Sequence, residues 1–312
     1  MIDFSHFNSI FELTSYFNSE EKCKKVIFES RWNKHDVVCP FCGQHHCTTR
    51  TDGRFHCSHC KANFSVTVGT IFENTKIPLV KWFLAMYLIS CHKKGISSVQ
   101  LATDIHVTQK TAWYILHKVR TLFAYYDTPA LEGEIELDET YVGGKETNKH
   151  EWKRVEGTQG RSTKTKTPVF GMIQRNGNVY AMQVENTKAE TLLPIIKQFC
   201  IEHSQLFTDE LSAYNVLDRE GYYHAIIRHG MKEYSKKGVT TNRIEGFWSH
   251  FKRMVYGIYH SVSPKFLQQY INESVYRYNT RKISESMRLA DMFKKSIKAC
   301  SYMEIKHYKA VA

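Results

Sequence analysis

The spacing of apolar residues changes in character along the chain. Apolar positions at helical spacing predict helices within residues 1–34 and 71–127, the second range including the apolar stretch 79–89. From residue 132 onward, short apolar runs with strand character alternate with segments of helical periodicity. The pattern therefore predicts a helical first part and a mixed second part.

The second part is predicted to begin with three strands. Gly133–Val142 is the first, and Thr167–Arg175 pairs with Asn178–Glu185 across Asn176-Gly177, a favourable tight-turn dipeptide. The remaining predicted elements are a helix at Lys188–Glu202, strands at Gln205–Asp209 and Tyr222–Arg228, a helix from about Thr241 and two helices within 264–300. Three strands followed by strands that alternate with helices indicate an α/β domain of ~150 residues.

This reading divides the chain into five regions. They are an N-terminal helical segment at 1–34, a cysteine-containing segment at 35–70, a helical region at 71–127, an α/β domain at 132–262 and C-terminal helices at 263–312. Within the α/β domain, Lys145–Lys166 is polar and holds seven Lys or Arg against three Glu. We expect it to form a mobile basic loop inserted in the sheet.

The charge balance of the 312 residues favours an anionic partner. Forty-three Lys and Arg against thirty-one Asp and Glu give a formal charge of +12, which makes nucleic acid the first candidate and an acidic membrane surface the second. The longest apolar run, Trp82–Cys91, is much shorter than the ~20 residues of a membrane-spanning helix. The N-terminus also lacks the pattern of a signal peptide. We therefore expect a soluble cytoplasmic protein with no membrane partner.

Four of the nine cysteines form two pairs. Cys39-Pro-Phe-Cys42 is followed after fourteen residues by Cys57-Ser-His-Cys60, a spacing typical of a tetrahedral zinc site. Four thiolates leave no open position on the ion, so a bound zinc is predicted to be structural. The alternatives are coincidental spacing, a redox couple, or replacement of one cysteine by a nearby histidine. The candidate histidines are His45, His46, His56 and His59.

Residues 95–116 contain capping and turn residues at the spacing expected of a helix-turn-helix. Ser97 or Ser98 can cap a first helix, Ile105-His106-Val107 forms the turn, and Thr108 can cap a second helix that ends near Arg120. A recognition helix presents its N-terminal end to the major groove. The residues predicted near that end are Gln109, Lys110, Trp113 and Tyr114. The alternative is an ordinary helical hairpin that packs between domains.

Three acidic residues in the α/β region suggest phosphoryl-transfer chemistry. Asp138 lies near the end of the first predicted strand, Asp209 ends a later strand, and Glu245 lies early in a helix. Carboxylates suit Mg²⁺, and two such ions ~3.5–4 Å apart can clamp the attacking and leaving oxygens of a displacement. The competing interpretation is that both aspartates are ordinary strand-end turn residues.

The helix around Glu245 has an apolar face and a polar face. Lys252 follows Glu245 by two helical turns and could contact a phosphate, or it could be a solvated surface charge. Asn242 is well placed as the N-cap, and Glu245 three residues later could then complete a capping-box-like arrangement instead of binding metal. The residues predicted to form the apolar face are Ile244, Phe247, Trp248, Phe251 and Val255.

Together these segments resemble an insertion-sequence transposase of the zinc-ribbon type, the ISXO-like group. The matching segments are Cys39-Pro-x-Cys42, Leu137-Asp-Glu-Thr-Tyr-Val-Gly-Gly144, Thr208-Asp-Glu-x-x-x-Tyr214, Thr241-Asn-Arg-Ile-Glu-Gly-Phe-Trp248 with Lys252-Arg253, and Tyr276-Arg-Tyr-Asn-x-Arg-Lys282. The resemblance implies an RNase H-like catalytic fold, Mg²⁺ dependence and transposon-end DNA as substrate. Members differ at the third catalytic position, where some have Asn, so Asn242 and Glu245 both remain candidates. We favour Glu245 for its charge and its spacing to Lys252.

The function that follows is a DNA transposase. The ribbon and helix-turn-helix are expected to bind terminal inverted repeats, and Asp138, Asp209 and Glu245 to hold two Mg²⁺ ions, for which Mn²⁺ can substitute. These ions would support hydrolysis at the transposon ends and transfer of the 3′-hydroxyls to target DNA. The predicted DNA-contacting residues are Gln109, Lys110, Lys164, Lys166, Lys252 and Arg253.

Two other functions fit the same sequence. One is a metal-dependent nuclease without strand transfer, and the other is a transposase-derived DNA-binding regulator without catalysis. For the transposase, we expect a homodimer or larger assembly on double-stranded DNA and an association with the nucleoid.

Overall fold

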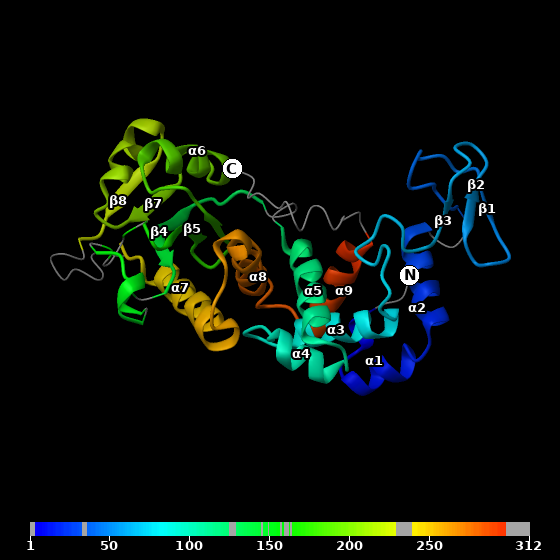
Figure 1. Cartoon of the computed structure of the whole chain (residues 1–312). Coiled ribbons are helices and arrows are strands. Elements are labelled where there is room, and N and C mark those ends of the chain that lie inside the picture. The colour runs from blue at the N-terminus through cyan, green and yellow to red at the C-terminus, as the bar shows by residue number, and fades with distance from the viewer. Residues whose placement is uncertain are drawn as a thin grey trace. The chain divides into compact units, whose positions relative to one another are not determined.

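The computed structural model describes most of the chain. The described residues are 4–32, 36–124, 129–144, 146–148, 150–156, 158, 162, 164–228 and 239–297. Within them the chain forms two compact units, one made of 4–122 with 282–297 and the other of 123–281 (Figure 1). The C-terminal helix of the described chain thus belongs to the same unit as the N-terminal helices. The finer five-part division made from the sequence remains a proposal.

The first unit is mostly helical. Its elements are η1 (Phe4–His6), α1 (Ile10–Tyr16), α2 (Glu20–Trp32), β1 (Cys47–Thr49), β2 (Phe55–Cys57), β3 (Asn63–Phe64), α3 (Leu79–Cys91), α4 (Ser98–Asp104), α5 (Gln109–Arg120) and α9 (Glu285–Ser296). Helix α3 is the apolar stretch predicted from the sequence, and it contacts α1, α2, α5 and α9. Among its fully buried side chains are Trp82, Ala85 and Met86. This helix is therefore the centre of the unit's core.

The cysteine-containing segment folds into a three-stranded antiparallel sheet in the order β1-β2-β3. Aromatic side chains support it, because Phe55 lies within 5.6 Å of Phe64 and within 5.2 Å of Trp32 of α2, measured between ring centroids. The sheet is too short to bury a core of its own. Its packing against the last turn of α2 supplies part of what it lacks.

Helices α4 and α5 form the predicted helix-turn-helix. Ser97 and Thr108 cap them, since their hydroxyls accept hydrogen bonds from the backbone N–H groups of Gln100 and Thr111. His106 in the turn between them has a positive φ of 51°. Gln109 and Lys110 are exposed. Trp113 and Tyr114, which the sequence placed near the exposed end, are instead half-buried, and Tyr114 packs edge-on against Trp82.

The second unit is built on a five-stranded mixed sheet in the order β6-β5-β4-β7-β8. Its strands are β4 (Glu134–Val142), β5 (Thr167–Gln174), β6 (Val179–Gln183), β7 (Gln205–Thr208) and β8 (Tyr223–Ile226). The first three pair antiparallel, while β7 lies parallel to β4 and β8 parallel to β7. This is the strand order of an RNase H-like fold, and the predicted α/β class is confirmed.

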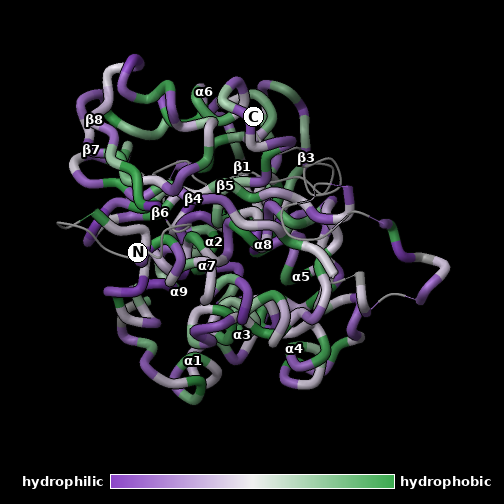
Figure 2. The backbone as a smooth tube through the Cα atoms, turned by 90° about the vertical axis from the view of Figure 1, so that its left-hand side faces the viewer, coloured by the Kyte–Doolittle hydropathy of each residue, from purple (hydrophilic) through white to green (hydrophobic). Residues whose placement is uncertain are grey.

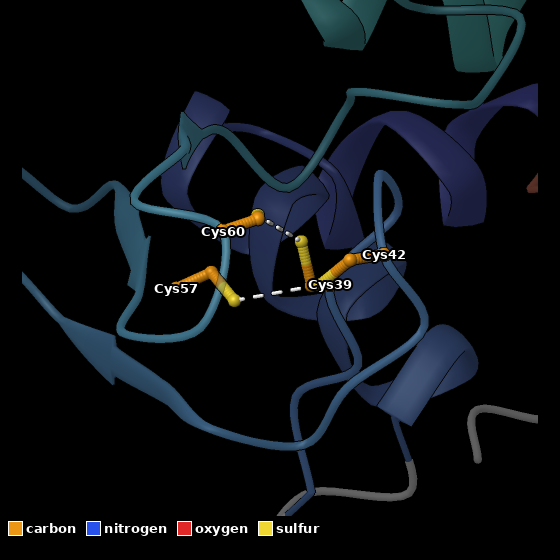
Figure 3. Close-up of side chains that lie close together, drawn as sticks. All are labelled: Cys39, Cys42, Cys57 and Cys60. Atoms are coloured by element: carbon orange, nitrogen blue, oxygen red, sulfur yellow. Dashed lines mark hydrogen bonds between the residues drawn. The ribbon is translucent and has the colours of Figure 1, made fainter.

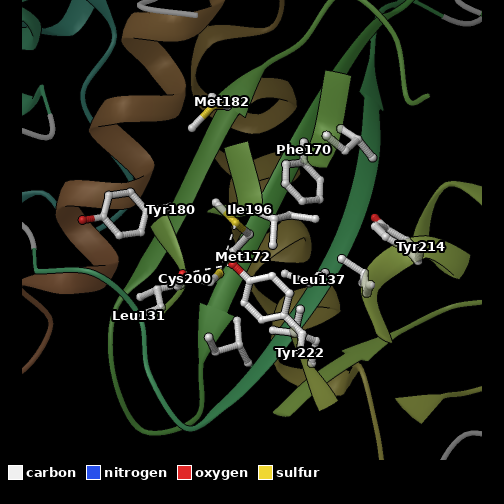
Figure 4. Packing of buried hydrophobic residues seen from close by; sticks show 14 of the residues in the cluster. Leu131, Leu137, Phe170, Met172, Tyr180, Met182, Ile196, Cys200, Tyr214 and Tyr222 are labelled. Carbon is white, nitrogen blue, oxygen red and sulfur yellow. Dashed lines mark hydrogen bonds between the residues drawn. The ribbon is translucent and has the colours of Figure 1, made fainter. Parts of the chain in front are cut away.

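Helices cover both faces of this sheet (Figure 1). The helical elements of the unit are η3 (Glu146–Asn148), η4 (Glu151–Lys153), α6 (Ala189–Phe199), η5 (Ser212–Glu220), α7 (Asn242–Met254), the π-helix η7 (Val255–Tyr259), η8 (Pro264–Phe266) and α8 (Leu267–Asn279), with η2 (Thr121–Phe123) at the junction of the two units. One face packs on α6 and η5, as Figure 4 shows for Leu137, Met172, Ile196 and Tyr214. The other face packs on α7 and α8.

The alternation of β4 decides which of its residues are available for chemistry. Ile135 and Leu137 are fully buried on the α6 face, so Glu136 and Asp138 point to the α7 face. Figure 2 shows hydrophobic and hydrophilic stretches following one another over short distances along the backbone. A carboxylate-bearing strand at the centre of a sheet is thereby held rigidly by its apolar neighbours.

One edge of the sheet is closed by a helix. Side-chain amides of α8 take the place of a sixth strand, because Asn279 both accepts from the N–H of Val179 at 2.8 Å and donates to its carbonyl at 3.1 Å. Gln268 accepts from the N–H of Gln183 at 2.7 Å. These contacts satisfy backbone groups of β6 that an open edge would leave available for pairing with another chain.

None of the helices in the described part of the chain combines the length and the apolar character needed to cross a bilayer.

Candidate active site and zinc-ribbon cluster

The four predicted zinc ligands lie together. Figure 3 shows Cys39 facing Cys60 and Cys42 facing Cys57, with Sγ–Sγ distances of 3.6 Å and 3.7 Å. All four sulfur atoms lie within 4.8 Å of one another. Four thiolates at ~2.3 Å from one zinc ion in a tetrahedron would be separated by ~3.8 Å. The donor set and its spacing therefore fit zinc.

Two of the histidines that could have replaced a cysteine are engaged elsewhere. His45 Nδ1 lies 2.7 Å from a carboxylate oxygen of Asp36, and His56 Nδ1 lies 3.0 Å from the amide oxygen of Asn63. Backbone hydrogen bonds from Cys60 and His59 lower the pKa of the Cys57 thiol to about 6, against the effect of burial. One thiolate in the group of four is favoured even without an ion, while the pKa of Cys42 is raised to about 12, against a backbone hydrogen bond at Gln44, by burial and hydrogen bonds with the other thiols.

A second cluster lies at the centre of the five-stranded sheet. Asp138 is on β4, and Asp209 follows the last residue of β7, the strand parallel to β4. Oxygens of Asp138, Glu139 and Asp209 all lie within 4.8 Å of one another. Glu139 and Asp209 are 8% and 6% exposed. The structure thus brings the two predicted aspartates together and adds a third carboxylate, Glu139, which was not predicted.

The negative charges of the carboxylates in this cluster repel one another. Burial, followed by the negative charges of Glu139, Asp209 and Glu245, raises the pKa of Asp138 to about 8. Carboxylates are placed in such surroundings when a cation compensates them, because an unpaired buried charge is costly. The oxygen-only donor set suits a hard divalent ion such as Mg²⁺.

Glu139 connects two of the sequence segments that carry the family resemblance. Its carboxylate accepts a hydrogen bond of 2.9 Å from the hydroxyl of Tyr214, which is fully buried in η5. Asp209 is held nearby, since its side chain accepts a hydrogen bond of 3.0 Å from the N–H of Leu211. In the sequence, Glu139 and Tyr214 both belong to segments that carry the family resemblance, and this is the signal that could have found Glu139.

Helix α7 packs closely against the sheet beside the cluster because a glycine of β5 has no side chain at the point of contact. Gly171 on β5 is the register partner of Asp138, and a Cβ on this residue would lie 2.5 Å from the ring of Trp248. Any larger residue would push α7 away. The predicted apolar face of α7 is buried, and Glu245 and Lys252 are exposed on the helix.

The two candidates for the third catalytic position are both at the start of α7. Glu245 lies near enough to raise the pKa of Asp138 but falls outside the tight group of three carboxylates, and its Oε1 accepts a hydrogen bond of 3.0 Å from Thr241. Asn242 is exposed. The prediction that Asn242 is the N-cap is wrong. Thr241 precedes the first helical residue and makes no side-chain cap, because a carboxylate from β4 already accepts the first N–H groups.

The predicted DNA-contacting side chains belong to both units. Gln109 and Lys110 lie on α5 of the first unit, whereas Lys252 and Arg253 lie exposed at the end of α7 in the second. In the basic segment, Lys164 is exposed and Lys166 is half-buried. Several residues of that segment, among them Lys145, lie outside the described residues.

Two family models match the chain. Residues 130–279 match the ISXO2-like transposase domain, and residues 18–63 match the transposase zinc-ribbon domain. The first range contains the sheet, α7 and the carboxylate cluster, while the second contains α2 and the four cysteines. The resemblance to a zinc-ribbon insertion-sequence transposase is thereby confirmed.

Two proteins of similar sequence also have names that refer to transposition. An uncharacterized protein in transposable element ISH50 of Halobacterium salinarum is 29% identical over 251 residues, covering 76% of this chain and 83% of its own. An uncharacterized transposase-like protein of Haemophilus influenzae is 29% identical over 111 residues, covering 36% of this chain and 89% of its own.

Among solved structures, a simian T-cell lymphotropic virus intasome in complex with PP2A regulatory subunit B56 gamma covers 73% of this chain and 76% of its own. Its TM-score is 0.32 and its identity is 10%. A likeness at this level adds nothing to the fold assignment made from the strand order.

Proposed function

We propose that the chain is a DNA transposase that binds transposon ends, hydrolyses phosphodiester bonds there and joins the freed 3′-hydroxyls to target DNA. The observation that carries this proposal is the buried carboxylate cluster of Asp138, Glu139 and Asp209 within a matched transposase domain. Without a cation the carboxylates of this cluster repel one another, which contributes to the raised pKa of Asp138. Asp209 directly follows β7, and Asp138 lies on β4 just beyond the residues paired with β7, so the cluster is at the carboxyl end of this parallel pair, where ligand groups converge in sheets of this kind.

Asp138 and Asp209 would hold two Mg²⁺ ions, with Mn²⁺ able to substitute. When bound, the ions supply Lewis acidity and an activated oxygen nucleophile at neutral pH. The protein's own contribution is rigidity. The strands fix Asp138, the turn N–H of Leu211 fixes Asp209, and Tyr214 orients Glu139. Glu139 would tune the charge of the cluster or serve as an additional ligand.

Glu245 is our choice for the third carboxylate. It is the residue of α7 whose negative charge acts on Asp138, whereas Asn242 offers only a neutral amide at the exposed start of the helix. Lys252 would contact a phosphate of the bound strand from its exposed position two turns further along α7. No covalent bond between protein and DNA is required.

Sequence-specific recognition would belong to the first unit. The exposed N-terminal end of α5, with Gln109 and Lys110, has the form of a recognition helix, and the cysteine ribbon would hold structural zinc. Lys164, Lys166 and Arg253 would contact phosphates of the transposon end or of the target duplex. We expect two or more copies of the chain on DNA, one for each transposon end.

A strand-transfer assay tests the proposal. Labelled duplexes with the terminal repeats of the element are incubated with the protein, target DNA and Mg²⁺. Joined products support the transposase, cut ends without joining identify a nuclease, and binding without cutting identifies a regulator. The variant Asp138→Asn is the control, because it removes a proposed ligand charge with almost no change of shape.

A further inference from the structure

Glu136 is a carboxylate with no exposure to solvent, on β4 two residues before Asp138. Its Oε2 accepts hydrogen bonds from the backbone N–H groups of Arg243 at 2.8 Å and Ile244 at 3.1 Å. Both N–H groups belong to the first turn of α7. A side chain from the centre of the sheet therefore caps a helix that begins more than one hundred residues later.

This cap replaces a local one. The first N–H groups of a helix have no partner within the helix, and Thr241, in the N-cap position, makes no side-chain hydrogen bond to them. A negative charge at this end is also favoured by the helix dipole. The start of α7 is consequently attached to β4 rather than to its own flanking loop.

Arg175 completes the attachment. Its Nε lies 3.1 Å from Glu136 Oε1, and its guanidinium also donates to the carbonyl of Thr240 at 3.3 Å. The guanidinium lies 4.2 Å from the ring centroid of Phe207, on the strand that leads to Asp209. One arginine thus contacts β4, β7 and the residue just before the N-cap of α7.

A second contact fixes the rotation of α7. Trp248 and Ile244 lie against Gly171, the register partner of Asp138. Glu245 is between these two attachments, one residue after Ile244 and three before Trp248. The position of its backbone relative to Asp138 is therefore set by Glu136 on one side and Gly171 on the other.

We propose that Glu136 and Arg175 form a positioning pair, which sets where Glu245 meets the metal site of Asp138 and Asp209. The proposal rests on the proposed function, because it assumes that Glu245 is a ligand there. The competing interpretation is a buried ion pair that only stabilises the fold. A positioning role predicts that the effect of Glu136 on metal binding depends on Glu245, and a structural role does not.

A double-mutant cycle on Mn²⁺ affinity tests this. Mn²⁺ binding is measured by titration calorimetry for the wild type, Glu136→Gln, Glu245→Gln and the double variant. We expect Glu136→Gln alone to weaken binding ~10–100-fold, as supporting groups of metal ligands commonly do. In the Glu245→Gln background the same change should add less than about twofold, because the two residues act as one unit. Equal losses in both backgrounds would overturn the proposal.

The matched control is Glu273→Gln. Glu273 is another buried carboxylate of this unit, 2% exposed and paired with Arg277 at 2.8 Å, but it lies on α8. It should lower the melting temperature as Glu136→Gln does and leave Mn²⁺ affinity within about twofold. A loss of affinity in Glu136→Gln no larger than in this control would also overturn the positioning role.

Two further variants keep the result interpretable. If Glu136→Gln does not fold, Arg175→Lys takes its place in the cycle, since it keeps the charge but not the shared contacts of the guanidinium. If Glu245→Gln alone binds Mn²⁺ like the wild type, Glu245 is not a ligand and the positioning role is refuted with it. The wider metal-site proposal is judged separately by Asp138→Asn, which should lose Mn²⁺ binding in either case.

Discussion

The two clusters of candidate metal ligands among the described residues are built in opposite ways. The four cysteines come from two short loops within twenty-two residues, on a small three-stranded sheet. Asp138 and Asp209 lie seventy-one residues apart and meet because β4 and β7 are neighbours in a five-stranded sheet with a core on each face. A bound metal would hold the small cysteine-containing sheet in its fold. In the five-stranded sheet, the fold brings the carboxylates together without a metal.

The two regions should therefore respond differently when metal ions are removed. A ribbon with so little core depends on its ion for folding, because metal affinity in such modules is folding free energy. The sheet that carries Asp138 is held by Ile135, Leu137 and their apolar neighbours, all independent of any ion. Stripping the metal should therefore unfold one region and spare the other.

The largest expected effect is loss of zinc from Cys57→Ser. Structural zinc sites of this kind contribute ~10–16 kcal/mol of binding free energy in small peptides, so the ribbon should unfold locally. Zinc content should fall from one ion per chain to none, and binding to transposon ends should drop, while metal-dependent nicking of random DNA partly survives. Elemental analysis and limited proteolysis check this. Wild-type protein that contains no zinc when purified without chelators would contradict the assignment.

Glu245→Gln should come next, and it concerns function rather than folding. Because supporting residues of metal sites commonly cost ~10–100-fold, loss of a direct ligand should slow cleavage and joining by at least ~100-fold. End binding and melting temperature should stay near those of the wild type, since Glu245 is exposed. Single-turnover cleavage of labelled ends measures the effect.

Asn242→Ala is the companion variant. Asn242 is exposed and is not the cap of α7, so we expect no loss of stability beyond a few tenths of a kcal/mol, as for other exposed sites. Activity should be retained. An inactive but folded Asn242→Ala, together with an active Glu245→Gln, would make Asn242 the third ligand.

The sequence was most informative where the chemistry is local. The spacing of the two Cys-x-x-Cys pairs is enough to predict that their thiols meet. Ser97 and Thr108 could be identified as the N-caps of α4 and α5, because an N-cap bonds the N–H only three residues later. Asp209 could also be predicted, because the end of β7 is visible as a change from apolar to polar residues, whereas Asp138, expected near a strand end, lies in the middle of β4.

Non-local contacts escaped the same reasoning. Glu139 follows Asp138 directly and should point to the opposite face of the strand, so nothing in the pattern placed its carboxylate beside Asp209. The misassigned cap at Asn242 has the same origin. The capping rule considers only residues that are close in sequence. The N–H of Arg243 in the first turn of α7 instead donates to Glu136, which lies 107 residues earlier.

The pH dependence of stability sharpens the comparison of the two clusters. The pKa of Asp138 is raised from 3.8 to about 8 in the folded, metal-free protein, so between these values the folded state holds more protons than the unfolded state. The free energy of unfolding of the metal-free second unit should then decrease as pH rises from about 4 to 8. Added Mg²⁺ should oppose this decrease. Urea unfolding at pH 5 and pH 8, with and without Mg²⁺, measures both effects, and Asp138→Asn is expected to flatten the dependence.

The smallest expected effect is on the salt dependence of DNA binding, and it tests whether the basic segment of the second unit shares in recognition with α5 of the first. Neutralising Lys164 and Lys166 leaves up to two phosphates without a cationic partner, so the slope of log affinity against log salt should become shallower by ~0.9 for each such phosphate on duplex DNA. The weakening should be equal for transposon ends and random duplexes, because binding to phosphates carries no sequence information. Lys110→Ala on α5 should differ, reducing the preference for transposon ends over random DNA. Fluorescence anisotropy at several salt concentrations separates the two outcomes. An unchanged slope in the Lys164/Lys166 double variant would mean that this segment does not bind DNA, so that Lys252 and Arg253 would remain as the proposed phosphate-binding residues of the second unit.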